Sequence, residues 1–332
     1  MIRIDGSFGE GGGQILRTAI ALSCITGMDV EVFNIRANRP KPGLKAQHLK
    51  GIQIAKEICS AQVEGLRMGS TKIVFRPGKL KVRDMNIDIG TAGSITLLLQ
   101  TILPPVIHAE KSCRLEITGG TDVSWSPSID YFRFVTLRAL KEMDAEIQIH
   151  IKRRGYYPKG GGRVVVEVRE SQLNGRKFQK THCRKVEGIS HCSNLPEHVA
   201  KRQAFSASRF LEKMGIKCEI ETEVLKSKST GSGITLFCNY KGSVALGERG
   251  KPAEKVGMEA GMDIAREITS DGVFDRHLAD QIMTFAFMAK TKTEYTATSI
   301  TDHARSNAYV INAFSDESVK IEGRKIFIFP GY

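Results

Sequence analysis

The chain has 332 residues, of which 41% are hydrophobic and 26% are charged, so it can bury a sizeable core and does not have the composition of a disordered protein. It carries 49 Lys and Arg against 36 Asp and Glu, a formal net charge of +13, which favours a polyanionic partner such as nucleic acid or a nucleotide. The longest apolar stretch, Thr96 to Ile107, contains two prolines and is too short to span a bilayer, so no membrane association is expected.

The first 80 residues alternate between helical and strand patterns. Apolar residues three or four positions apart predict a helix over 14–26, and alternation predicts a strand over 28–35. A second helical pattern covers 44–59, and further β-rich segments end at the Pro77-Gly78 turn. This order of elements is typical of an α/β unit.

The same pattern returns twice along the chain. Gly90 to Gln100 resembles Gly11 to Arg17, because both are glycine-rich turns that open an apolar helix. The strand block Ile73 to Gly78 is echoed by Ile326 to Gly331, and a third block, Gly162 to Val168, also follows a glycine run. We therefore predict an α/β (α+β) fold of three repeated units of roughly 60–90 residues, although a chance echo of short motifs is the alternative.

Residues 182–275 differ from the rest in their charge. Basic and acidic residues nearly balance there, whereas +11 of the net +13 lies within residues 1–181. Helical patterns over 196–214 and 252–269 enclose two strand patterns. The prediction is a small α+β domain over 182–275, inserted into a large domain formed by 1–181 and 276–332.

The seven cysteines are scattered and include no CxxC pair. Neither a disulfide framework nor a zinc cluster is therefore expected, and a reducing cytoplasm fits best. His182-Cys183 and His191-Cys192 would each offer at most one metal ligand, because adjacent residues of a strand point to opposite faces.

Two glycine-rich loops are candidates for phosphate binding. Gly6 to Gln14 leads into a helix, whose N-terminal N–H groups favour an anion, but a tight turn would also need these glycines. Glu10 would repel a phosphate in this loop unless a divalent ion lay between them, and Arg17 lies one helical turn beyond the loop. Tyr157 to Gly162 places a lysine inside a glycine loop, which could hold phosphate or be a solvated hairpin.

Six segments, taken in order, are similar to those of one known family. They are 5–17 (DGSFGEGGGQILR), 35–48 (IRANRPKPGLKAQH), 119–122 (GGTD), 155–162 (GYYPKGGG), 277–281 (HLADQ) and 301–303 (TDH). The chain resembles the RNA 3'-terminal phosphate cyclases from residue 2 to its last strand. The resemblance implies three βαβαββ-like units forming one large domain, with a smaller inserted domain.

The resemblance also implies a ligase-type reaction that needs ATP and Mg²⁺ or Mn²⁺. ATP adenylylates a histidine and releases pyrophosphate, and the AMP then passes to the 3'-phosphate of an RNA. The neighbouring 2'-hydroxyl attacks the activated phosphate, which gives a 2',3'-cyclic phosphate and AMP. The partners implied are thus ATP and an RNA with a 3'-phosphate end, while the sequence leaves open whether the chain forms a homo-oligomer.

The roles that the resemblance implies fall on residues from both ends of the chain. His303 matches the nucleophile, and a neutral imidazole is suited to attack an α-phosphate. Glu10 and Asp280 match metal-binding carboxylates, hard ligands that suit Mg²⁺ or Mn²⁺, and Arg17 matches a catalytic residue near the phosphates. Further matches near the phosphates are Gln14, Arg39, Gln47 and Gln281. Those around the purine are Pro127, Tyr131 and His277, and bacterial relatives have a tyrosine at the position of His277. Weaker candidates for the RNA end are Arg36, Lys41 and Lys45.

Three other functions remain to be weighed. A non-catalytic cyclase-like protein of ribosome assembly would share the fold but should lack the nucleophile, so His303 argues against it. Enolpyruvyl transferases contain related repeats but do not need His303 or the GEGGGQ segment. A pure RNA-binding module has no positive support, because aromatic residues make up 7% of the chain without an RNP-like cluster.

Overall fold

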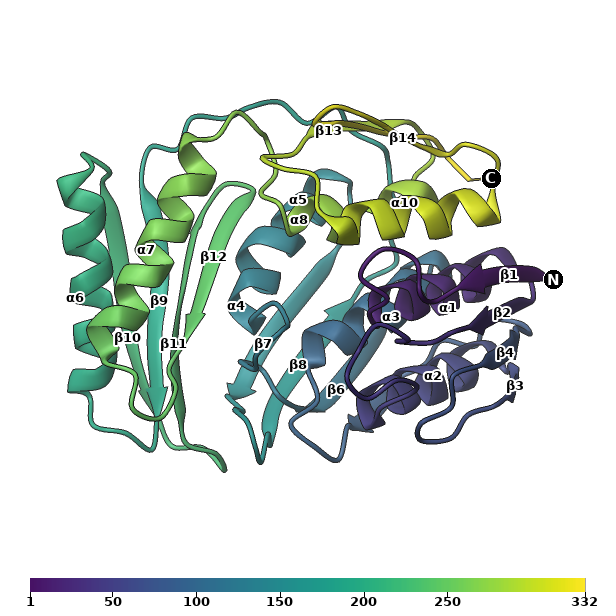
Figure 1. The fold of residues 1–332 in the computed structure, drawn as a ribbon, viewed down its shortest axis with the longest axis horizontal. Helices are drawn as coiled ribbons and strands as arrows, with labels where there is room; N and C mark the ends of the chain where they lie inside the picture. The colour runs from purple at the N-terminus through teal and green to yellow at the C-terminus, as the bar shows by residue number, and fades with distance from the viewer. Residues whose placement is uncertain (332) are drawn as a thin grey trace.

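The computed structural model describes residues 1–331, which form four small sheets and the helices that pack on them (Figure 1). Three of these sheets have four strands and one has three. The mixed α/β class predicted from the sequence is confirmed.

The first sheet holds the N-terminal strands. In spatial order it consists of β1 (Ile2–Asp5), β2 (Val30–Phe33), β4 (Ile73–Arg76) and β3 (Gln62–Glu64). β1 pairs with β2 in parallel, whereas β4 pairs antiparallel with both its neighbours. The connecting helices are α1 (Gln14–Thr26), which has the predicted bounds, and α2 (Ala46–Cys59).

The second sheet has the same strand order and the same pairing directions as the first. Its strands are β5 (Met85–Asp88), β6 (Cys113–Gly119), β8 (Gly162–Val168) and β7 (Ile147–Arg153). β5 and β6 are parallel, and β8 is antiparallel to β6 and β7. Its helical segments are α3 (Ile95–His108), α4 (Ile129–Tyr131), the π-helical η1 (Phe132–Thr136) and α5 (Leu137–Glu142).

The third sheet is formed by the C-terminal part of the chain. Its order is β13 (Thr293–Thr296), β15 (Lys325–Ile328) and β14 (Val319–Glu322), accompanied by α8 (Leu278–Gln281), α9 (Met283–Met288) and α10 (Asp302–Phe314). β4, β8 and β15 each lie between two antiparallel partners in their sheets. The three strand blocks whose sequences echo one another therefore occupy corresponding positions.

The fourth sheet lies at the side of the molecule away from the termini (Figure 1). It consists of β10 (Cys218–Leu225), β9 (Val186–Ser193), β11 (Gly231–Cys238) and β12 (Lys241–Leu246), with α6 (His198–Lys213) and α7 (Ala253–Thr269) packed on it. Leu211, Ile234 and Ile264 belong to a core of its own. The boundaries 182 and 275 stay a prediction.

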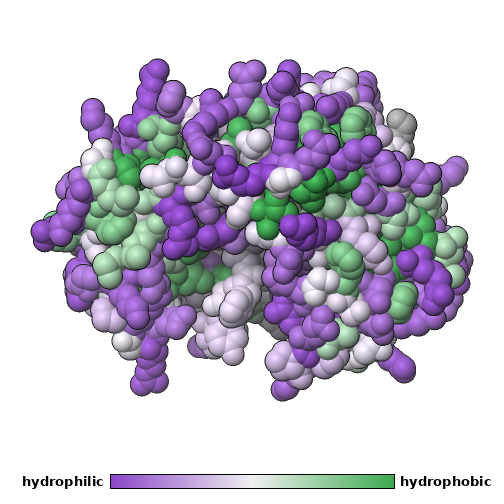
Figure 2. Space-filling view, turned by 45° about the horizontal axis from the view of Figure 1, so that its top comes forward, coloured by the Kyte–Doolittle hydropathy of each residue, from purple (hydrophilic) through white to green (hydrophobic). Residues whose placement is uncertain are grey.

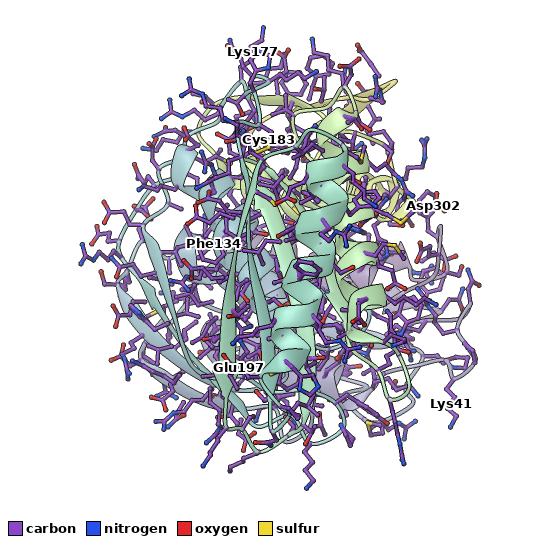
Figure 3. All side chains as sticks on the ribbon, turned by 90° about the vertical axis from the view of Figure 1, so that its left-hand side faces the viewer. Lys41, Phe134, Lys177, Cys183, Glu197 and Asp302 are labelled. Carbon is purple, nitrogen blue, oxygen red and sulfur yellow. A yellow bond between two sulfur atoms is a disulfide. The ribbon has the colours of Figure 1, made fainter. Side chains whose placement is uncertain are left out.

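This sheet also contains a disulfide that the sequence analysis did not expect. Cys183 and Cys238 are bonded, with their Cα atoms 5.9 Å apart, near the Cys183 label of Figure 3. The physical reason is the antiparallel pairing of β11 with β9, which brings the end of β11 beside the start of β9. The bridge weakens one argument for a reducing cytoplasm, which stays a prediction.

The outer surface is largely polar. Hydrophilic side chains cover most of the face shown in Figure 2, with hydrophobic patches between them. Within residues 1–331, no helix has the length and apolar character needed to cross a membrane.

Candidate active site

The glycine-rich loop between β1 and α1 packs against α10, the last helix of the chain. The ring of Phe8 stacks on that of Tyr309 with centroids 4.3 Å apart, and the Asp5 amide donates a hydrogen bond of 3.2 Å to the Tyr309 hydroxyl. These contacts hold the loop against the side of α10. Residues close to opposite ends of the sequence therefore meet here.

Glu10 is the residue of this loop that contacts the predicted nucleophile. Its Oε2 lies 3.3 Å from Nε2 of His303 and 3.0 Å from Nη2 of Arg39. His303 is the second residue of α10, whose start is capped by Thr301 Oγ1, the acceptor for the Ala304 amide at 3.1 Å. The structure thus brings together three residues that the sequence analysis predicted at the site.

The surroundings of His303 favour its neutral form. Burial lowers the pKa of His303 below its usual value, and Arg17, His277 and Arg39 lower this pKa further, whereas the Glu10 carboxylate raises it. The N-terminal end of a helix dipole also disfavours an imidazolium. Because a neutral imidazole has a free lone pair, these surroundings suit the nucleophilic role predicted for His303.

Two glycines of the loop leave room for side chains that pack against it. Gly11 has φ +57°, and a Cβ there would lie 2.7 Å from Nδ2 of Asn38. A Cβ on Gly13 would lie 2.5 Å from Nε2 of His48. The loop is therefore shaped as much by close packing as by a capacity to bind phosphate.

His48 was missed as a site residue by the sequence analysis, although it ends one of the recognised segments. Its Nδ1 accepts a hydrogen bond of 3.1 Å from the Lys45 amide. Burial and then the charges of Arg17, Arg36 and Lys45 lower the pKa of His48 to about 3, so it is neutral. The sequence feature that could have identified His48 is its position directly after Gln47, which lines the same small pocket as Arg17.

Arg17 lies at the centre of the predicted polar residues. Its guanidinium donates to Gln14 Oε1 at 2.5 Å and to Gln100 Oε1 at 3.2 Å. Burial lowers the pKa of Arg17 to about 10, against the opposing effect of Asp280, so it stays a cation at neutral pH. It lines two small pockets, one with Gln47 and one with Gln14 and Gln281.

Asp280 is held close to Arg17 by the backbone of α8. Asn307, which the sequence analysis also missed, donates from Nδ2 to the Asp280 carbonyl at 2.9 Å. The Asp280 side chain is buried, and within residues 1–331 its carboxylate makes no hydrogen bond or ion pair. Burial raises the pKa of Asp280 to about 8, with Asp275 and Glu10 raising it and Arg17 lowering it.

The residues predicted to contact the purine differ in their exposure. Tyr131 is buried and donates its hydroxyl to both Asp275 carboxylate oxygens at 2.8 Å. Asp275 also accepts from the His277 amide at 2.7 Å, which links Tyr131 to His277. His277 is exposed, and the carbonyl of Pro127 accepts from Thr96 Oγ1 at 2.8 Å. The roles proposed for these residues stay predictions.

The basic side chains predicted to contact the RNA end differ in their exposure and in their hydrogen bonds within the protein. Arg36 donates from Nη1 to the carbonyls of Lys41 and Gly43, each at 2.8 Å, so its guanidinium supports the loop. The Lys41 side chain is exposed and projects from the molecule in Figure 3, and Lys45 is half-buried. Lys41 is thus the freest of the three to meet an anion.

Glu10 and Asp280 fit the donor chemistry of a hard divalent cation, because both offer carboxylate oxygens. The raised pKa of Asp280 reflects a carboxylate buried near other negative charges, and a bound cation would favour its ionised form. These residues could therefore hold Mg²⁺ or Mn²⁺.

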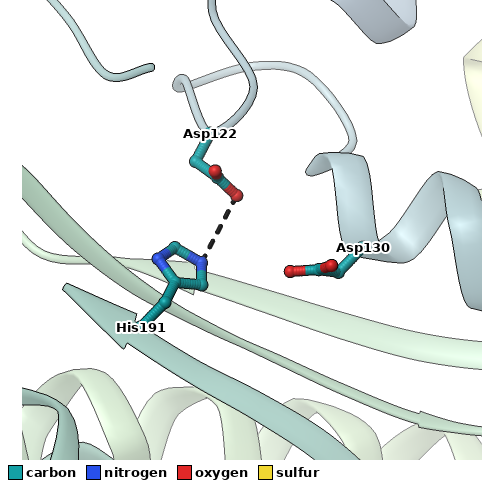
Figure 4. A group of neighbouring side chains, drawn as sticks. All are labelled: Asp122, Asp130 and His191. Atoms are coloured by element: carbon teal, nitrogen blue, oxygen red, sulfur yellow. Dashed lines mark ion pairs between the residues drawn. The ribbon is translucent and has the colours of Figure 1, made fainter. Parts of the chain in front are cut away.

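A second group of metal-ligand types lies elsewhere, between α4, the Asp122 loop and β9 (Figure 4). Ligand atoms of Asp122, Asp130 and His191 lie within 4.8 Å of one another, and all three are buried. Arg154 already occupies this space, with Nη1 3.3 Å from Asp122 and Nη2 2.7 Å from Asp130. Because a cation beside a guanidinium would be repelled, we interpret this group as a buried ion-pair network.

The chain is similar to known proteins over most of its length. A family model described as RNA 3'-terminal phosphate cyclase matches residues 8–321. A protein of that name from Archaeoglobus fulgidus is 60% identical, with 99% of this chain and 100% of the relative covered. Those from Methanococcoides burtonii and Pyrococcus furiosus are 50% and 46% identical, covering 98% and 97% of this chain and 97% and 96% of the relatives.

Proposed function

Since this chain belongs to the RNA 3'-terminal phosphate cyclase family and is an enzyme of that kind, we propose that it uses ATP to convert the 3'-phosphate of an RNA to a 2',3'-cyclic phosphate. The observation that carries the proposal is the 3.3 Å approach of Glu10 to His303, which joins the glycine loop to the start of α10. This contact gathers a nucleophile, a carboxylate and cations at one place.

In the first step His303 attacks the α-phosphorus of ATP and pyrophosphate leaves. Its lowered pKa leaves the imidazole lone pair free at neutral pH. Charge that develops on the phosphate oxygens is offset by Arg17, which remains a cation, and by Arg39. The product is a phosphoramidate between AMP and the imidazole, a good donor of AMP.

In the second and third steps the RNA end takes the place of the imidazole. An oxygen of the 3'-phosphate attacks the phosphorus of AMP, which releases His303 and forms an RNA-adenylate. The 2'-hydroxyl then loses its proton and attacks the 3'-phosphate, so that AMP leaves and the ring closes. Arg39, Lys41 and Lys45 are the cations that we propose for the RNA end.

Glu10 and Asp280 would hold the divalent ion, which when bound neutralises charge on the triphosphate. The residues themselves do the rest of the positioning. Arg39 restrains the Glu10 carboxylate, and Asn307 fixes the backbone of Asp280. We propose the cytoplasm as the location of this reaction, which cell fractionation can test.

The experiment that tests the function is incubation with ATP labelled at its α-phosphate, together with Mg²⁺ or Mn²⁺. We expect label on the protein that is stable to base and labile to acid, as for a histidine phosphoramidate, and its transfer to a 3'-phosphorylated oligonucleotide. His303→Ala should carry no label. The matched control is His198→Ala, because His198 is an exposed histidine on α6.

The proposal would be contradicted if the folded wild-type protein acquired no label in the presence of metal. Label retained on His303→Ala would instead move the nucleophile to another residue. An oligonucleotide without the 3'-phosphate serves as the substrate control and should receive no AMP.

A further inference from the structure

Loops from the second and fourth sheets meet in one place, which we call the loop cluster and define as residues 90–94, 119–127, 154–162 and 226–232. The Thr121 amide donates to the Gly155 carbonyl at 2.8 Å. The Tyr156 amide donates to Ser229 Oγ at 2.8 Å, and that hydroxyl donates to the Gly160 carbonyl at 2.8 Å. Direct hydrogen bonds thus tie three of the loops together.

The fourth loop, 90–94, packs against the others. A Cβ on Gly160 would lie 2.7 Å from the Cα of Ala92, so the two backbones are in close contact. Residues 90–94 form the glycine-containing turn between β5 and α3. The cluster is therefore one continuous surface.

The buried ion-pair network of Arg154 supports this cluster. Arg154 pairs with Asp122 and Asp130 and also reaches Oε2 of Glu223 on β10 at 2.6 Å. The Tyr156 hydroxyl is 2.8 Å from Nδ1 of His191 on β9. Because these bonds join the second sheet to the fourth, the loops above them are fixed and present their side chains in a defined arrangement.

Two aromatic rings project from this fixed base. Trp125, the single tryptophan of the chain, is 97% exposed, and Tyr157 is 76% exposed. Trp125 has φ +65°, a backbone conformation that costs a bulky residue energy. Strain and exposure of a large ring at one residue point to a ligand that stacks on it.

The same loops also carry cations. Lys159, Lys226 and Lys228 are exposed, and within residues 1–331 none of them makes an ion pair. A Cβ on Gly161 would lie 3.1 Å from the Cβ of Lys228, which sets Lys228 beside the loop that carries Tyr157 and Lys159. Exposed rings and unpaired cations on one set of connected loops are features by which proteins hold unpaired nucleotides.

The loop cluster is continuous with the candidate active site. A Cβ on Gly93 would lie 3.2 Å from the Cβ of Gln47, and Gln47 lines the same pocket as Arg17 and His48. An RNA whose 3' end is at His303 could therefore extend over this surface.

We propose that the loop cluster binds the single-stranded RNA that precedes the terminal nucleotide. Trp125 and Tyr157 stack on its bases, and Lys159, Lys226 and Lys228 contact its phosphates. This inference rests on the proposed function, because it concerns the same RNA substrate. It predicts that affinity depends on the length of the RNA.

The first test uses the fluorescence of Trp125, since no other tryptophan contributes. Stacking on a base should quench the emission when a 3'-phosphorylated decanucleotide is added, but not when a dinucleotide or ATP is added. Binding is followed separately by the anisotropy of a labelled RNA. A decanucleotide that binds without changing the tryptophan emission overturns the inference, and quenching by ATP alone assigns Trp125 to the nucleotide instead.

Variants separate the rings from the cations. Trp125→Ala should weaken binding of the decanucleotide on the order of tenfold with an unchanged salt slope, and Trp125→Phe should recover most of the loss. Lys228→Ala should reduce the slope of log K against log salt by about 0.7, the value for one phosphate contact on a single strand. The matched controls are Phe205→Ala and Lys213→Ala, exposed residues of α6 outside the cluster, which should bind like wild type.

Failure of this inference is distinguishable from failure of the proposed function. If wild type is adenylylated and cyclises RNA ends, but Trp125→Ala and Lys228→Ala bind the decanucleotide as tightly as wild type, only the loop cluster is wrong. If wild type is not adenylylated, the proposed function fails first. Circular dichroism and thermal melting of each variant show whether a loss of binding comes from unfolding.

Discussion

Gln14 donates a hydrogen bond of 3.1 Å to Asn307, a residue 293 positions further along the chain. The same Asn307 oxygen accepts from Thr18 Oγ1 at 2.7 Å, and the Asn307 amide nitrogen donates to the Asp280 carbonyl at 2.9 Å. One buried amide thus connects α1, α8 and α10 beneath the candidate active site. The two ends of the chain are parts of a single site because of such contacts.

Asn307→Ala should therefore lower both stability and adenylylation. It leaves the Gln14 amide and the Thr18 hydroxyl without their buried acceptor, at a cost of about 2–4 kcal/mol in the free energy of unfolding. Urea denaturation and label transfer from ATP measure the two effects. Asn86→Ala is the control, because Asn86 is exposed on β5, and a variant of Asn307 as stable as this control would contradict the account.

The pKa of His303 should respond in opposite directions to two neighbours. The Glu10 carboxylate raises this pKa and the Arg39 guanidinium lowers it, so Glu10→Gln should lower it further and Arg39→Gln should bring it back toward the ordinary value. The two changes should differ in sign because the two neighbours carry opposite charges. NMR titration of the imidazole in metal-free protein measures them, and shifts of the same sign in both variants would disprove the arrangement.

The stability of the metal-free protein should fall as the pH rises from about 4 toward 8. The folded-state pKa of Asp280 is raised to about 8, whereas an unfolded Asp ionises near pH 4. Between these values the folded state binds the extra proton, so raising the pH favours unfolding. Asp280→Asn should remove this part of the pH dependence, as measured by the free energy of unfolding in urea at several pH values.

A divalent ion should stabilise the wild type at pH 8 by binding Glu10 and Asp280. Mn²⁺ should raise the melting temperature of the wild type and have a much smaller effect on Asp280→Asn. This variant leaves Asp122, Asp130 and His191 intact, so it also tests the ion-pair interpretation of that group. An equal rise in the melting temperature of both proteins would instead assign the metal to Asp122, Asp130 and His191.

The local sequence was enough to predict elements whose ends are marked by glycine. The helix of residues 14–26 has its predicted bounds because glycines flank it, and Gly27 has φ +72° at its C-terminal end. The glycine-rich starts and the echoed strand blocks likewise mark corresponding positions in different sheets.

Contacts between distant residues could not be predicted in this way. The hydrophobic periodicity of the sequence does not predict the contact between Glu10 and His303. Only the family resemblance assigned both residues to one site. His48 and Asn307 are buried polar residues whose partners lie in other elements, and such partners are set by tertiary packing. The pairing of Cys183 with Cys238 depends in the same way on the register of two strands.

Close packing in the glycine loop can be separated from backbone strain by two matched variants. Gly11 and Gly27 both have positive φ, but a Cβ meets Asn38 at 2.7 Å only at Gly11, while at Gly27 nothing lies within 4 Å. Gly27→Ala should cost about 1 kcal/mol of stability and spare adenylylation. Gly11→Ala should also slow adenylylation, because it displaces the segment that carries Arg39. Equal adenylylation rates would show that the packing is unimportant.

The Arg154 network should be essential for joining the second and fourth sheets. Its guanidinium is 1% exposed and pairs with Asp122 and Asp130, both of which are fully buried. Arg154→Met would leave Asp130 in the interior without its guanidinium partner and Asp122 with only His191, whose Nε2 lies 3.4 Å from its Oδ1, which should cost about 3–5 kcal/mol. The triple variant that adds Asp122→Asn and Asp130→Asn should recover part of this loss, since it removes the charges that need pairing. Arg163→Met, at an exposed arginine of β8, is the control. Urea denaturation measures all three, and a wild-type-like Arg154→Met would mean that the carboxylates are neutral without their partner.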